Sequence, residues 1–191
     1  MATFAGCRAA AASEAEVAMV ETARLRMLAV LGAAEASADE VAVAEAVGAL
    51  AARRGWVVLT GGGPGVMEAA CRGAVEARGL TVGILPTSRA GNGYPNQWVR
   101  IAVFTGAGSA RNSFNVLSAT LCVAIGGGAG TLSEIALAMK AGVPVWCWRS
   151  WRIQPPPSRQ VSLPQRSDDA KELLAALEAE LDRTRPAAAP A

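Results

Sequence analysis

The segment LCVAIGGGAGTLSEIALAMK, residues 121–140, joins an apolar run to a glycine-rich turn and a helical pattern. Residues 121–125 have the length and composition of a buried strand, and the apolar residues of 132–139 recur at helical spacing. This arrangement is typical of anion-binding turns, because the amides of the first helical turn are free and the helix dipole adds partial positive charge there. A tight strand–helix turn without a ligand has the same pattern.

A second copy of this pattern occurs earlier in the chain. The apolar run WVVLT, residues 56–60, is followed by GGGPGVMEAACRGAVEARG, residues 61–79. Pro64 suits a helix start, where its missing N–H costs nothing. Ligands of parallel α/β sheets bind beyond the carboxyl ends of the strands, and both glycine clusters occupy such positions. Two clusters at one sheet edge therefore favour a phosphate site.

Apolar runs alternate with helical patterns along the rest of the chain. We expect strands at 26–31, 56–60, 81–85, 99–104, 121–125 and 143–148. We expect helices at 38–54, between Gly65 and Gly79, at 110–118, before Gly142 and at 169–183. The alternation predicts an α/β fold: a Rossmann-like, doubly wound parallel sheet of about six to seven strands with helices on both faces.

The length of 191 residues fits one domain of ordinary size. We predict a flexible alanine-rich extension at 1–24, a single Rossmann-like domain at 25–183 and a disordered tail at 184–191. Residues 112–133 carry no charge, but their glycines and hydroxyl and amide side chains argue against a membrane span. Segment 86–98 is a long polar loop, and 154–164 is a proline-rich connector.

The composition excludes several classes of function. A net charge of +2 gives no basis for a nucleic-acid or membrane partner. Histidine is absent, which excludes histidine-dependent nucleophile systems and His-ligated zinc, and we predict no metal site and no cofactor of the protein's own. The four cysteines form no CxxC pair, and Cys122 and Cys147 fall in strand-like runs. Buried thiols fit a reducing compartment, so we predict a cytoplasmic protein.

Two charged residues near the second glycine cluster are candidates for chemistry. Glu134 either forms a capping box with the amide of Thr131 or places a carboxylate beside a phosphorylated ligand. Arg111, at the start of the preceding helix, is either a solvated surface residue or a bidentate phosphate ligand. Both interpretations of each residue remain open on these patterns alone.

The neighbouring polar and aromatic residues also have two interpretations each. Asn112 either contacts the ligand or caps its helix, and the cap is favoured. Tyr94 and Trp98 either stack on a planar ring or seal the edge of the core, and sealing is slightly favoured. The cluster Trp146, Trp148 and Trp151 is interpreted as core or subunit contact.

Three segments resemble a known protein group: residues 61–74, 109–119 and 125–145. This Rossmann-type group, once labelled "lysine decarboxylase-like", includes the lonely-guy cytokinin-nucleotide phosphoribohydrolases and the molybdenum cofactor carrier proteins. The resemblance covers about residues 26–148. The hydrolase motif begins with proline where this chain has Gly126. The residues Gly108-Ser109-Ala110-Arg111-Asn112 instead match the "Gly-x-Ala-Arg-polar" context of the carrier branch, which is therefore favoured.

The resemblance implies a set of functional residues. The expected phosphate- or ligand-binding residues are Gly61, Gly62, Gly63, Gly65, Met67, Arg111, Asn112, Gly127, Gly128, Gly130, Thr131 and Glu134. In a hydrolase, Arg111 and Glu134 would be catalytic.

The functional hypotheses that follow are a carrier of the molybdenum cofactor, a phosphorylated pterin, and a phosphoribohydrolase that cleaves the N-glycosidic bond of nucleoside 5′-monophosphates. A nucleotide sensor or scaffold that uses the same pocket is a third possibility. In each case the partner is a small phosphorylated ligand, and the resemblance implies a homo-oligomer, a dimer or a tetramer.

Overall fold

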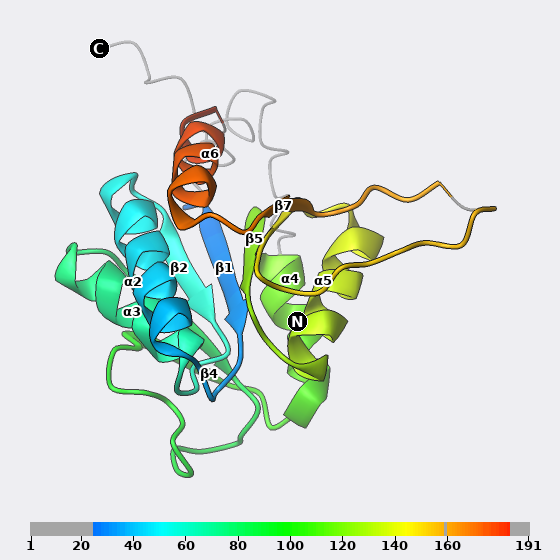
Figure 1. Cartoon of the computed structure of the whole chain (residues 1–191). Coiled ribbons are helices and arrows are strands. Elements are labelled where there is room, and N and C mark those ends of the chain that lie inside the picture. The colour runs from blue at the N-terminus through cyan, green and yellow to red at the C-terminus, as the bar shows by residue number, and fades with distance from the viewer. Residues whose placement is uncertain (1–24, 159, 184–191) are drawn as a thin grey trace, which may run out of the picture. The chain divides into compact units, whose positions relative to one another are not determined.

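The computed structural model of the chain describes residues 25–158 and 160–183, so the predictions for 1–24 and 184–191 lie outside the described residues. Within these ranges, parallel strands form a seven-stranded sheet in the order β4-β3-β2-β1-β5-β6-β7 (Figure 1). The strands are β1 Met27–Gly32, β2 Val57–Thr60, β3 Thr81–Leu85, β4 Ile101–Phe104, β5 Leu121–Ile125, β6 Val145–Trp148 and β7 Gln165–Ser167. The helices are α2 Ala38–Arg53, α3 Val66–Glu76, the 3-10 turn η1 Gly108–Arg111, α4 Asn112–Ser118, α5 Ala129–Ala141 and α6 Ala170–Arg183.

Strand β1 lies at the point where the strand order reverses. The chain adds β2, β3 and β4 on one side of β1 and then returns to place β5 on the other side. Residues 27–29 of β1 pair with 57–59 of β2, and residues 28–32 pair with 121–125 of β5. The predicted doubly wound parallel sheet is confirmed. Such a reversal leaves a crevice at the carboxyl ends of the two central strands.

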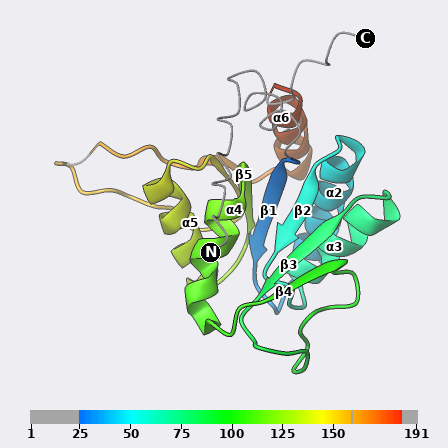
Figure 2. The same ribbon diagram turned by 180° about the vertical axis from the view of Figure 1, so that it is seen from behind.

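Helices cover both faces of the central sheet (Figures 1 and 2). Leu28 and Val30 of β1 pack into the cluster that includes residues of α2, α3 and α6, whereas Ala29 and Leu31 pack into the cluster of α4 and α5. Alternate residues of one strand are therefore buried on opposite faces, as expected for a parallel sheet. No helix in the described part of the chain is long and apolar enough to cross a membrane.

The two edges of the sheet differ from the sequence prediction. All four residues of β4 are exposed. The prediction that helices cover both faces of the sheet is therefore wrong at this strand. The reason is that loop residues, rather than a helix, connect β3 to β4. At the other edge, the short strand β7 pairs with β6. Its sequence, QRS, has no apolar run from which a strand could be predicted.

Candidate functional site

A cavity of about 260 Å³ lies beside the carboxyl ends of β1 and β5, next to both glycine clusters. Its lining residues are Val30, Leu31, Gly32, Ala33, Ala34, Gly61, Met67, Arg111, Asn112, Gly128, Gly130, Thr131 and Glu134. Eight of the twelve residues expected to bind a ligand line this cavity. The exceptions, Gly62, Gly63, Gly65 and Gly127, lie in the same two turns but are not among its lining residues.

The turn after β1 contributes lining residues that the sequence analysis missed. Gly32, Ala33 and Ala34 border the cavity, and the backbone carbonyl of Ala33 accepts a hydrogen bond from the amide of Val66, 3.1 Å away. The only sequence signal was the position of this turn at a third strand end, because it contains a single glycine. The turn after β1 therefore supplies a third wall.

Arg111 and Glu134 form a buried ion pair in the wall of the cavity. Nη1 of Arg111 lies 3.3 Å from Oε1 of Glu134, and the two side chains are 11% and 8% exposed. The interpretation of Arg111 as a solvated surface residue is therefore wrong. Gly61 makes this position possible, since a β-carbon there would lie 2.3 Å from Nη2 of Arg111. The guanidinium thus lies against the first glycine turn while its partner belongs to α5.

Glu134 does not cap its helix. Helix α5 begins at Ala129 with Gly128 as N-cap and has no side-chain cap hydrogen bond, so Thr131 and Glu134 both lie inside the helix. Oε1 of Glu134 instead accepts a hydrogen bond of 2.9 Å from Nδ2 of Asn115 on α4. Of the two interpretations of Glu134, the capping box is therefore wrong, because the helix starts earlier than that motif requires. Asn115 is a second residue that the sequence analysis missed.

The ion pair leaves some of the polar atoms around it unpaired. Burial raises the pKa of the Glu134 carboxyl above its usual value, while the hydrogen bond from Asn115 and the charge of Arg111 oppose that shift. Nε of Arg111 and Oδ1 of Asn115 are buried without a hydrogen-bond partner. Buried polar atoms normally have partners, and an unpaired one calls for an explanation, such as a functional role or a bound water or ion. The site therefore holds a cation whose hydrogen-bonding capacity is only partly used.

Asn112 connects α4 to the first turn of α5. Its Nδ2 donates to Oγ of Ser133 at 2.8 Å, and Oγ of Ser133 donates to the carbonyl of Gly130 at 2.7 Å. Asn112 is buried and lines the cavity, and no side chain caps α4. The favoured interpretation of Asn112 as a helix cap is thus wrong. Its side chain fixes the position of α5 relative to Arg111.

The second glycine turn is open toward the cavity. Gly128 and Gly130 are exposed, and a β-carbon at either position would meet no atom within 4 Å. The first-turn amides of α5 have no partner within the helix and coincide with the positive end of its dipole. Thr131 is buried, and Gly127 packs against its side chain. This turn has the properties of an anion site.

The aromatic residues of the long loop, Tyr94 and Trp98, are not among the residues that line the cavity. Tyr94 lies beside Gly63, where a β-carbon would be 3.0 Å from its hydroxyl oxygen. Trp98 is half-buried, and its backbone carbonyl accepts a hydrogen bond from Oγ1 of Thr81 at 2.6 Å. The favoured sealing interpretation agrees with these positions.

The tryptophans of β6 and of the segment after it occupy three different environments. Trp148 is buried in the core and Trp146 packs against it, as predicted. Trp151 is 41% exposed, and its indole Nε1 donates a hydrogen bond of 3.1 Å to the carbonyl of Gly128. The sequence analysis missed this contact with the second glycine turn.

The described cysteines are not candidates for nucleophilic chemistry. Cys71, Cys122 and Cys147 are free and buried, which confirms the prediction for the latter two. Burial raises the pKa of Cys71 to about 11, of Cys122 to about 12 and of Cys147 to about 11. These thiols stay protonated at neutral pH and are therefore unreactive.

Known proteins share this architecture. The molybdenum cofactor binding protein of Rippkaea orientalis is 39% identical over 83% of this chain and 88% of its own, with a TM-score of 0.64. The molybdenum cofactor carrier protein of Chlamydomonas reinhardtii is 32% identical over 84% of this chain and 100% of its own, with a TM-score of 0.70. An uncharacterized protein of Archaeoglobus fulgidus is 40% identical over 119 residues, which are 62% of this chain and 77% of that protein.

The model of the SLOG cluster4 family matches residues 25–179, which contain every residue that lines the cavity. The match extends through β7 and most of α6, beyond the part of the chain in which the sequence motifs occur. The chain belongs to the SLOG cluster4 family.

Proposed function

We propose that this protein binds the molybdenum cofactor in the cavity between the glycine turns. The phosphate of the pterin lies on the first-turn amides of α5, and Arg111 neutralises its charge. The observation that carries this proposal is that a buried arginine with an unpaired Nε and the open N-terminal turn of α5 border one cavity. The similarity to two proteins described as binding or carrying this cofactor supports the pterin as the ligand.

The alternative function is hydrolysis of the N-glycosidic bond of a nucleoside 5′-monophosphate. A buried carboxylate beside the arginine favours it, because Glu134 would stabilise an oxocarbenium-like ribose or orient the attacking water. Arg111 would then bind the phosphate or the leaving group. The motif context of Arg111, in which Ala110 precedes it and Asn112 follows it, favours the carrier function over this one.

One pair of measurements separates the two functions. The protein is titrated with molybdopterin, and in parallel it is incubated with AMP while release of adenine and ribose 5-phosphate is measured. A carrier binds molybdopterin and leaves AMP intact. Sustained release of adenine by the wild-type protein, abolished in Glu134→Gln, would replace the carrier proposal with the hydrolase.

The Glu134→Gln variant is a sharp probe because the amide keeps the shape of the side chain. In a hydrolase, turnover falls by orders of magnitude while substrate still binds. In a carrier, removal of a negative charge near the phosphate leaves affinity equal or slightly higher. We expect the carrier result. Intact thermal unfolding of the variant serves as the control for its fold.

We also propose that the protein is a homo-oligomer, a dimer or a tetramer, that buries the uncovered edge of the sheet. Ile101, Val103 and Phe104 of β4 are 41–45% exposed, and Phe114 and Leu117 of α4 are 46% and 67% exposed. Exposed large apolar side chains of this kind, here on β4 and α4, are typical of protein–protein contacts when they form a patch. Light scattering after gel filtration tests this: Val103→Lys should lower the measured mass to that of a smaller species, and a wild-type monomer would refute it.

A further inference from the structure

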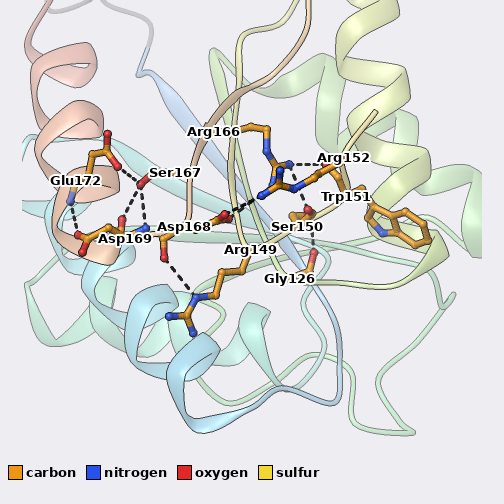
Figure 3. Close-up of polar contacts among 10 residues, drawn as sticks. All are labelled: Gly126, Arg149, Ser150, Trp151, Arg152, Arg166, Ser167, Asp168, Asp169 and Glu172. Atoms are coloured by element: carbon orange, nitrogen blue, oxygen red, sulfur yellow. Dashed lines mark hydrogen bonds and ion pairs between the residues drawn. The ribbon is translucent and has the colours of Figure 1, made fainter. Parts of the chain in front are cut away.

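Strand β6 and the segment that follows it contact the second glycine turn through three hydrogen bonds, of which Figure 3 shows the one between Ser150 and Gly126. The amide of Gly126 donates to the carbonyl of Trp148 at 3.0 Å, and Oγ of Ser150 donates to the carbonyl of Gly126 at 2.5 Å. The third contact is the hydrogen bond from the indole of Trp151 to the carbonyl of Gly128. Two of these hydrogen bonds, from Ser150 and Trp151, therefore connect an irregular segment to the open turn of the site.

Arg166 of β7 holds this segment in place. Its Nη1 donates to the backbone carbonyls of Ser150 and Trp151, at 3.2 and 2.6 Å. Asp168 pairs with both Arg166 and Arg152, so the backbone of the segment is fixed by a charged cluster (Figure 3). The indole of Trp151 points away from that cluster (Figure 3). The ring is thus anchored at its nitrogen and presents an exposed surface beside the glycine turn.

The cavity is small for a ligand that carries both a phosphate and a ring. A volume of about 260 Å³ is smaller than the roughly 300–1,000 Å³ typical of sites that enclose a drug-sized ligand. A phosphorylated pterin or nucleotide whose phosphate lies at the N-terminus of α5 must therefore extend past the lining residues. Gly128, which lines the cavity and is exposed, is the residue that Trp151 contacts.

We propose that Trp151 is a ligand-binding residue whose indole stacks on the planar ring of the bound molecule. Ser150 and Arg166 are positioning residues, because their hydrogen bonds hold the indole of Trp151 at a fixed position beside the glycine turn. The proposal rests on the proposed function, because it requires a ligand that carries both a phosphate and a planar ring. Stacking on an indole favours any flat heterocycle, so Trp151 contributes to affinity for the ring and not for the phosphate.

The test compares ligands with and without a ring. Titrations use molybdopterin and AMP as ring-bearing probes and inorganic phosphate as the ringless probe, on the full-length protein. Trp151→Ala should lower the affinity for each ring-bearing probe by about tenfold. It should change the affinity for inorganic phosphate by less than about twofold. Trp151→Phe keeps an aromatic face and loses only the N–H, so it should retain affinity within about threefold.

Fluorescence gives a readout that a purely structural role would not change. Stacking of a heterocycle on Trp151 should quench the intrinsic emission of the wild-type protein, and this quenching should disappear in Trp151→Phe. Trp98→Phe is the matched control, because the hydrogen bonds of Trp98 with Thr81 and Asn96 are made by its backbone, whereas the indole of Trp151 contacts Gly128. That variant should keep the quenching.

Two results would overturn the proposal in distinguishable ways. If Trp151→Ala lowers the affinities for phosphate and for the ring-bearing probes equally, the indole only supports the glycine turn. The proposed function then stands without the ring contact. If the wild-type protein binds neither molybdopterin nor AMP, both proposals fail together.

Discussion

The two glycine turns have nearly the same sequence and the same place in the fold, but their surroundings differ. Each follows a buried strand and precedes a helix at the same edge of the sheet. In the first turn, the amide of Val66 donates to Ala33, and Asn96 contacts the backbone carbonyls of Gly62 and Gly63 at 2.8 Å each. In the second turn, Gly128 and Gly130 face open space.

The comparison shows that a glycine motif specifies a backbone shape and not a vacant site. The chain itself fills the first turn: neighbouring backbone and side chains occupy the space around its glycines. The second turn is filled at Gly126 and Gly127 but open at Gly128 and Gly130, and the segment after β6 supports it from the outside. Substitutions at equivalent glycines should therefore have opposite consequences, with stability affected at one turn and binding at the other.

The largest expected effect is loss of stability at the first turn. Gly65 has φ of 68°, and a β-carbon there would lie 2.3 Å from the carbonyl oxygen of Ala34. Gly65→Ala should lower the free energy of unfolding by about 3 kcal/mol or more, because the strained φ and the overlap add. Urea denaturation measures this. Gly128→Ala is the control and should change stability by less than about 1 kcal/mol; equal losses in both variants would refute the distinction.

The next effect concerns binding at the second turn. Arg111→Ala should weaken binding of the phosphorylated ligand by about ten- to a hundredfold, which corresponds to roughly 1.5–3 kcal/mol for a charge-assisted contact. Gly128→Val, which places a branched side chain on the open turn, should also abolish or strongly weaken binding without unfolding the protein. Calorimetric titration measures both. An unchanged dissociation constant in either variant would place the phosphate elsewhere.

A smaller loss of stability should follow removal of the side chain that holds the first turn. Nδ2 of Asn96 donates to Gly63, and Oδ1 accepts from the amide of Trp98 at 3.0 Å. Asn96→Ala leaves a buried carbonyl unpaired and should cost about 1–3 kcal/mol. Ligand affinity, measured well below the unfolding midpoint, should stay within about twofold. A large loss of affinity with intact stability would assign Asn96 to the ligand site.

The smallest expected effect is a pH dependence at the second turn. The pKa of Glu134 is raised by burial, so the folded protein takes up a proton there at a pH at which the unfolded chain does not. The stabilisation from protonation is complete below the unfolded pKa and is lost as pH rises through the folded pKa.

Protonation also releases Arg111 from its anionic partner, so ligand affinity should rise by a few-fold as pH falls through this range. Glu134→Gln supplies the reference, because it removes the titrating group and keeps the acceptor for Asn115. Titrations between pH 5 and 8 compare the two proteins. An identical pH dependence in both would show that only the ligand's phosphate titrates.

Patterns within single segments were predictable from the sequence, whereas contacts between distant segments were not. The strands at 81–85 and 121–125 match the prediction residue for residue. Each is a buried apolar run whose two ends are fixed by the turns on either side. The pairing of Glu134 with Arg111 and Asn115 depends on how α4 lies against α5, which no local motif encodes. The capping-box motif offered a different partner for Glu134, the amide of Thr131, because the motif does not fix where α5 begins.

The glycine clusters in the sequence located the candidate site. The parts of it that contain few glycines were missed. Ala33 and Ala34 line the cavity although their side chains give no signal of binding. Trp151 contacts the site from a segment whose sequence indicated only a core or subunit role. In both cases the backbone position, fixed by distant strands, determines the contribution.

The central place of β1 has a consequence for how the chain folds. Leu28 pairs with Leu121, so one side of the first strand has no neighbour until the fifth strand has been synthesised. At a translation rate of roughly 5–20 residues per second, about 5–20 s pass between the synthesis of β1 and that of β5, and this edge is unpaired during that time. The nascent chain therefore exposes an apolar parallel edge for far longer than a small domain needs to collapse, and a chaperone that shields such edges during synthesis should raise its yield.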